Sequence, residues 1–202
     1  MLQTMPEFLQ AQDSSARWRQ WVRTLAVPIG LAIALFFLPL IVRAVFQIPW
    51  VMFQNFTDGI FYWGYAMQFD ELVRRVGLNY YSVRFGGILP DALVFSLIGP
   101  HDGMPVVRYA FAGMSCSMLF LLFWKRGAGI VAGLAAAFLW ALNPAAIRLQ
   151  QTGYVDVAGT YFLLLGTPLL LFPRISLPIA MAGGALLGLA VWSHTHAALA
   201  LF

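Results

Sequence analysis

Two acids in this sequence have neighbours that suggest chemistry. Asp58 follows Thr57 at the expected start of a helix, and Asp156 comes two residues after Tyr154. A carboxylate in such a place can act as a general base or orient an attacking group, and Asp156 could also bind a metal ion or an acceptor. Each acid has a plainer interpretation too, because an acid suits the first turn of a helix and a loop acid is often simply solvated.

Arginines and tyrosines supply candidate binding groups. The planar guanidinium of Arg84 suits a phosphate, and Arg148 and Arg108 are weaker candidates for the same role. Tyr62 and Tyr154 are the tyrosines that we expect beside a bound substrate. The alternative for the arginines is anchoring at a membrane interface, and for Tyr62 a place in an aromatic belt.

Metal binding has weak support in the sequence. His194 and His196 are two residues apart, so on a helix they point about 200° away from each other, a poor geometry for sharing one metal. His194 and Asp156 remain the weak metal candidates, and a divalent metal is the cofactor that we consider. The sequence contains no phosphate-binding loop, dinucleotide fingerprint or paired cysteine motif.

The composition excludes most soluble classes. Of the 202 residues 61% are hydrophobic and 10% are charged, and the mean hydropathy is +0.78, whereas an ordinary globular protein has roughly 25% charged residues. The single cysteine excludes a disulfide scaffold. The net charge of +4 does not indicate a nucleic-acid partner, because the basic residues flank apolar runs. The sequence therefore predicts an integral membrane protein.

The apolar runs predict an all-α membrane fold with about five transmembrane helices. A polar lead, 1–23, precedes a transmembrane domain, 24–202, which has a long outer loop, 43–103. Apolar sequence continues to the last residue, which indicates a chain truncated at its carboxyl end or part of a longer polytopic protein. The expected spans are 24–42, 104–124, 127–146, 157–172 and 175–196.

Charge asymmetry gives the orientation. If the spans alternate, six basic residues fall on the side of the amino terminus, which the positive-inside rule makes cytoplasmic. Six of the eight acids fall on the opposite, outer side. The basic residues are Arg17, Arg19, Arg23, Lys125, Arg126 and Arg174, and the acids are Asp58, Asp70, Glu71, Asp91, Asp102 and Asp156.

The outer loop is expected to carry two amphipathic surface helices. Thr57 can cap a helix that begins at Asp58 and continues to Gly77. A second helix is expected to open near Arg84 or Pro90 and to end before Gly99. Both would lie along the membrane with their apolar faces down. The simplest role for such helices is to cover the outer face of a bundle.

Three local features of this arrangement match one enzyme family. They are the run Thr57-Asp58-Gly59-Ile60-Phe61-Tyr62, the run Tyr80-Tyr81-Ser82-Val83-Arg84-Phe85 followed by Pro90, and Asn143-Pro144 followed by Thr152-Gly153-Tyr154-Val155-Asp156. In order and spacing the chain resembles the amino-terminal part of the C-type fold (GT-C) membrane glycosyltransferases. It is similar to the protein O-mannosyltransferases and the aminoarabinose transferases over residues 20–200. Where that family often has Asp-Glu, this chain has Asp58-Gly59.

The resemblance implies a function. It implies transfer of a sugar from a polyprenyl-phosphate-linked donor to an acceptor on the outer face of a bacterial inner (plasma) membrane. Asp58 and Asp156 would be the catalytic carboxylates, and Arg84 or a divalent metal would receive the leaving phosphate. The partners would be the lipid-linked donor, the membrane, and either the missing carboxyl-terminal part or another membrane chain. Neither the sugar nor the acceptor follows from the resemblance.

The alternative is a non-catalytic multi-pass membrane protein, either a transporter portion or an assembly subunit. Transporters usually place polar residues near the membrane midplane, often beside broken helices. Here the acids gather on the outer side and the expected spans are almost free of them. This distribution favours a surface site over a transport path.

Overall fold

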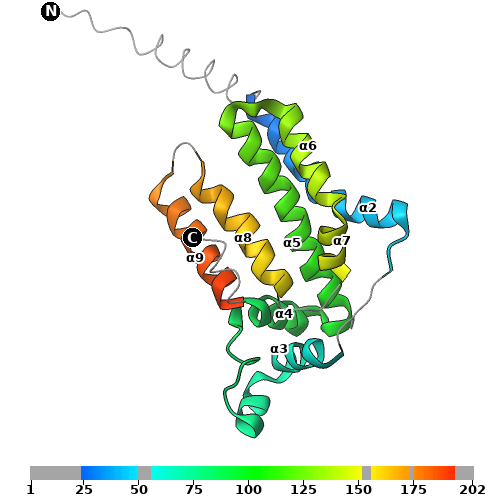
Figure 1. Ribbon diagram of the computed structural model, residues 1–202, viewed down its shortest axis with the longest axis vertical. Coiled ribbons are helices and arrows are strands. Elements are labelled where there is room, and N and C mark those ends of the chain that lie inside the picture. The colour runs from blue at the N-terminus through cyan, green and yellow to red at the C-terminus, as the bar shows by residue number, and fades with distance from the viewer. Residues whose placement is uncertain (1–23, 50–55, 152–155, 173–174, 194–202) are drawn as a thin grey trace, which may run out of the picture.

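The computed structural model describes residues 24–49, 56–151, 156–172 and 175–193. Within these ranges every regular element is a helix and no strand is present, so the predicted all-α class is confirmed for the described chain. Figure 1 shows an elongated bundle with two helices packed across its lower end.

The bundle helices run alternately down and up. The first bundle helix runs toward α3 (Phe56–Val76) and α4 (Phe85–Ile98), and the next one runs away from them. Because this alternation continues along the chain, the links between the bundle helices lie alternately at its two ends (Figure 1). A helix overlaps each of the five ranges where a span is expected. These helices are Thr24–Phe36, α5 (Pro100–Phe123), α6 (Gly129–Ala141), α8 (Asp156–Leu170) and α9 (Leu177–Ser193).

Proline divides two of the expected spans. The stretch 24–42 is bent by 40° between Thr24–Phe36 and α2 (Leu38–Phe46), because Pro39 has no N–H to donate and its ring crowds the preceding turn. Likewise α6 stops at Ala141, and Pro144 opens a separate short helix, α7 (Pro144–Gln151). The expected spans over 24–42 and 127–146 are therefore each built from two helical segments.

Glycine reverses the chain between α5 and α6. The π-helical turn Trp124–Ala128 contains Gly127 with φ 84°, and Gly129 follows with φ 87°. Both angles lie in the left-handed region, which residues with a Cβ atom avoid. The turn places Lys125 and Arg126 at the end of the bundle opposite α3 and α4 (Figure 1).

Small residues let the bundle helices approach closely. A Cβ atom on Gly113 of α5 would overlap the carbonyl oxygen of Phe36, so the first helix lies directly on α5. A Cβ atom on Gly166 of α8 would come within 3.0 Å of the carbonyl oxygen of Gly183 on α9. Small residues at helix contacts are characteristic of packing inside membranes, where close backbone approach replaces the hydrophobic drive.

The lower end of the bundle is formed by α3 (Phe56–Val76) and α4 (Phe85–Ile98). α4 contacts α5, α8 and α9 as well as α3, so it lies between α3 and the bundle. Ile88 and Phe95 of α4 are buried, yet Leu89 and Leu97 are exposed. The prediction that α4 is amphipathic is therefore wrong, because its apolar residues surround the whole helix.

By length and composition, one continuous helical stretch of the described chain is able to cross a membrane. Within the described ranges, only Pro100–Ala141, which contains α5 and α6, is by itself long and apolar enough to cross a bilayer. The bent pair Thr24–Phe36 and Leu38–Phe46 meets the same criterion when taken together. α4, Val157–Leu170 and α9 are apolar but shorter, at 10–17 residues.

The close contact at Gly113 predicts a stability difference between two glycine substitutions. Gly113→Ala should destabilise the protein by about 1–3 kcal/mol because the new methyl group overlaps the backbone of the first helix. Gly184→Ala in α9 is the matched control, since a Cβ atom there meets nothing within 4 Å and alanine is the better helix former. Thermal unfolding in detergent measures both, and equal melting temperatures would contradict the packing.

Candidate functional site

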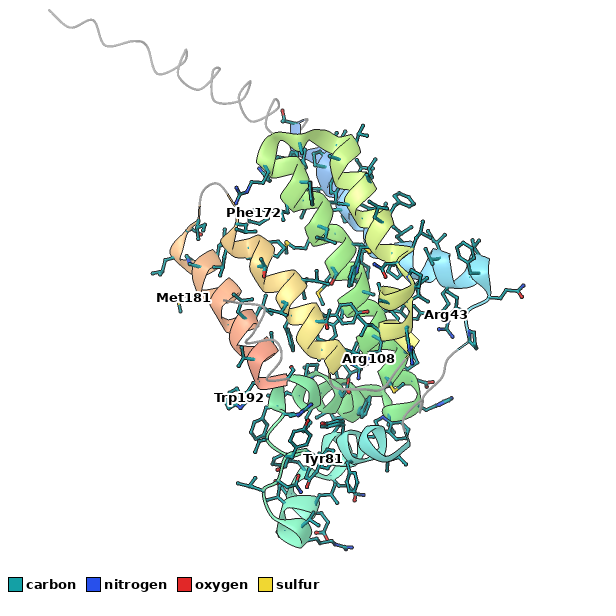
Figure 2. The ribbon with its side chains drawn as sticks, viewed as in Figure 1. Arg43, Tyr81, Arg108, Phe172, Met181 and Trp192 are labelled. Carbon is teal, nitrogen blue, oxygen red and sulfur yellow. The ribbon has the colours of Figure 1, made fainter. Side chains whose placement is uncertain are left out.

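A buried ion pair joins α4 to α5. Arg108 Nη2 donates to Asp91 Oδ2 at 2.9 Å, and the side chains are 1% and 9% exposed, respectively. Figure 2 places Arg108 where α5 meets α4 and the lower end of α8. Two opposite charges in this apolar surrounding attract each other strongly, and this attraction offsets the cost of removing both from water.

The ion pair borders an aromatic core. The Tyr161 ring of α8 stacks on Phe111 of α5 with centroids 5.7 Å apart, and Arg108 is close enough to act electrostatically on the Tyr161 hydroxyl. Within the described part of the chain, Asp91 Oδ1 and the Tyr161 hydroxyl have no hydrogen-bond partner. Burial raises the pKa of the Asp91 carboxyl, and Arg108 opposes that shift. The site therefore has unused hydrogen-bonding capacity.

The structure places Arg108 differently from the prediction, and it shows a role for Asp91 that the sequence analysis did not identify. Arg108 was a weaker candidate for phosphate binding, with anchoring at the membrane interface as the alternative, but it points inward because Asp91 provides a buried countercharge. Asp91 was counted only as an outer acid. The signal that could have singled it out is its position inside the apolar run Phe85–Ile98, since an acid in such a segment is functional or paired by default.

The turn between α3 and α4 is held by its own side chains. Asn79 Oδ1 accepts hydrogen bonds from the backbone N–H groups of Tyr81 and Ser82, at 2.9 and 3.2 Å, and Ser82 Oγ accepts one from the Asn79 N–H at 2.8 Å. Asn79 Nδ2 also donates to the Tyr65 hydroxyl at 2.7 Å. These bonds fix the turn to α3 and set the direction from which α4 begins.

Arg84 lies at the start of α4 among tyrosines. Its guanidinium donates to the Tyr80 hydroxyl, and its Cζ atom lies 3.9 Å from the Tyr80 ring centroid and 5.8 Å from that of Tyr62. Tyr81 stands edge-on to Tyr62 at 5.3 Å and appears below α4 in Figure 2. The structure therefore brings together two predicted binding residues, Arg84 and Tyr62, and buries both.

Arg148 lies in a different place. It is an exposed residue of α7 and lines a groove of about 680 Å³ formed with the end of α2. None of the residues lining this groove belongs to α3 or α4. The prediction that grouped Arg148 with Arg84 in one substrate site is therefore not supported by the groove in which Arg148 lies.

For the predicted catalytic acids, the structure describes the position along the helix only. Asp58 is the third residue of α3 and Asp156 is the first residue of α8, and both of these helices contact α4. The side chains of Asp58 and Asp156 lie outside the described part of the structure, as do Tyr154 and His194. Among the described side chains, no three His, Cys, Asp or Glu residues are grouped to hold a metal ion.

Comparison with known proteins identifies no relative. No protein-family model, curated protein or solved structure matches this chain.

The ion pair predicts an asymmetric response to mutation. Asp91→Leu should destabilise the protein by about 3–5 kcal/mol, because it leaves a buried guanidinium that cannot lose its proton. Arg108→Met should cost less, because Asp91 can bind a proton. The double variant Asp91→Leu/Arg108→Met should recover most of the loss, because no unpaired charge remains. Unfolding in denaturant measures all three, and additive losses in the double variant would contradict the pairing.

The same pair predicts a pH dependence for the Arg108→Met variant. Without Arg108, burial alone acts on Asp91, so its pKa in the folded state lies above the unfolded value of about 3.9. The folded state then holds its proton more tightly, and stability falls as pH rises from that unfolded pKa through the folded one. Thermal unfolding at pH 5 and pH 8, compared with wild type, tests this, and a parallel pH response would contradict it.

Proposed function

We propose that this chain is an integral membrane protein and is a C-type fold membrane glycosyltransferase or the amino-terminal part of one. The reaction transfers a sugar from a polyprenyl-phosphate-linked donor to an acceptor on the outer face of a bacterial inner membrane. The observation that carries the proposal is that α4, which begins next to Arg84, contacts both α3, whose third residue is Asp58, and α8, whose first residue is Asp156.

Membrane placement is supported by the apolar sides of the bundle. Val131 and Leu139 of α6 are 80% and 74% exposed, and further large apolar side chains are exposed on the other bundle helices. Such a surface is unfavourable in water and favourable against lipid chains. The basic turn at Lys125 and Arg126 would then be cytoplasmic, and α3 and α4 would face outward.

The chemistry assigns a separate task to each group. The acceptor oxygen attacks the anomeric carbon, the bond from that carbon to the phosphate oxygen breaks, and the polyprenyl phosphate leaves with the electron pair. Asp58 takes the proton of the acceptor as general base, and Asp156 orients the acceptor or holds a divalent metal. Arg84 stabilises the leaving phosphate, and the Tyr80 and Tyr62 rings beside it orient its guanidinium.

Sugar transfer in membranes tests this function. Asp58→Asn and Asp156→Asn should each lower transfer from a radiolabelled polyprenyl-phosphate sugar by about 100-fold or more, because an amide cannot accept the proton or bind a metal in the same way. Asp102→Asn, an exposed acid in the first turn of α5, is the matched control and should retain activity. The assay uses this chain and a longer protein that contains it, at equal expression.

Each outcome of the transfer assay has a distinct meaning. Loss confined to the Asp58 and Asp156 variants supports the assignment, and activity of the longer protein alone identifies this chain as one part of the enzyme. If folded wild-type protein transfers no sugar from any polyprenyl-phosphate donor in either form, the proposal is wrong. The non-catalytic membrane protein is then the better hypothesis.

A further inference from the structure

The groove between α2 and α7 combines apolar walls with one cationic side chain among its described lining residues. Its volume is about 680 Å³, within the range of roughly 300–1,000 Å³ that is usual for ligand sites. Arg148 and the neutral Gln47 are its polar lining residues. The apolar lining consists of Phe46, Ile48, Pro49, Leu142, Pro144 and Ile147.

The local backbone builds this groove. Gln47 ends α2 in the left-handed conformation, with φ 49°, and the N–H groups of Gln47 and Ile48 both bond to the carbonyl of Arg43. The turn lets Ile48 pack on the core beside Ile147, while Phe46 stays 62% exposed. Together with the exposed Ile41 and Val45 of the same helix, Phe46 forms an apolar surface at the edge of the groove, which indicates contact with an apolar molecule.

The positive charge of Arg148 indicates that this molecule is anionic. It is exposed and makes no ion pair or side-chain hydrogen bond with any residue of the described ranges. A guanidinium binds phosphate oxygens through two parallel N–H donors. A cation beside apolar walls therefore matches an amphiphile whose head is a phosphate and whose tail is a hydrocarbon chain.

We propose that this groove binds one anionic phospholipid, with its phosphate against Arg148 and an acyl chain along Ile147, Leu142 and Phe46. A phospholipid is favoured over a peptide because α2 also exposes Ile41 and Val45, which lipid chains would cover. The inference rests on the membrane placement proposed above and not on the transfer reaction. It assigns a lipid distinct from the sugar donor.

Lipid binding to the purified chain tests this site without any sugar donor. Native mass spectrometry in detergent compares dioleoyl phosphatidylglycerol, which is anionic, with dioleoyl phosphatidylcholine, which has no net charge. Wild type should prefer phosphatidylglycerol, and Arg148→Gln should weaken that binding by about tenfold, the effect of one charge-assisted contact. Ile147→Trp, which fills the groove, should weaken binding of both lipids.

The controls separate this site from general lipid association. Arg126→Gln removes a charge at the opposite end of the bundle and should leave the preference unchanged. Equal phosphatidylglycerol binding by Arg148→Gln and wild type, at equal melting temperatures, would overturn the proposal. Displacement of phosphatidylglycerol by an equimolar polyprenyl phosphate would also overturn it, because the donor lipid would then be the occupant. Neither result bears on whether Asp58 and Asp156 are needed for transfer.

Discussion

The buried ion pair between Asp91 and Arg108 determines how the lower end of the bundle is assembled. α4 is apolar on all sides, with buried Ile88 and exposed Leu89 in adjacent positions. The hydropathy of its side chains alone therefore does not define which face of α4 lies against the bundle. The rotation that directs Asp91 toward Arg108 pairs the two buried charges, whereas a rotation that separates them leaves Asp91 without this countercharge, at high cost. The pair thus favours the observed orientation of α4.

The rest of the candidate site depends on that orientation. Tyr62 and Tyr65 of α3 belong to the same core cluster as Ile88 and Phe95 of α4, so α3 is positioned by α4. Arg84 precedes the first residue of α4, and the adjoining Phe85 contacts Trp192 of α9 with ring centroids 5.6 Å apart. Figure 2 shows Trp192 at the lower end of α9, beside the start of α4. Aromatic contacts therefore hold the Arg84 side of α4 as the ion pair holds its middle.

Much of the fold follows from the sequence because its signals are local. Apolar runs of near-membrane length predict the bundle helices, and Gly99 and Gly77 end α4 and α3 near the expected positions. The interpretation of the sequence missed the bend before Pro39 and the end of α6 before Pro144, because it relied on the hydropathy of the whole run and not on single prolines. Proline nonetheless interrupts the helix locally, because burying apolar residues cannot replace the hydrogen bond that its missing N–H would make.

The site was less predictable than the fold. Arg84 and Tyr62 were identified separately, and the structure brings them together because the Asn79–Ser82 turn folds the chain back over α3. The pairing of Asp91 with Arg108 joins residues 17 positions apart on different helices. No periodicity specifies such a contact, which arises only when α4 and α5 pack. For the same reason sequence spacing could not show that Arg148 lies in a separate groove.

The proposed function requires that the bundle crosses a membrane with α3 and α4 on the outer face. Substituted-cysteine labelling in intact cells measures this directly, in a Cys116→Ala background that removes the one native thiol. Leu78→Cys, at an exposed position between α3 and α4, should react with a membrane-impermeant maleimide, whereas Ala128→Cys in the basic turn should react only after lysis. Equal labelling of both sites in intact cells, or recovery of the protein in the soluble fraction, would contradict the account.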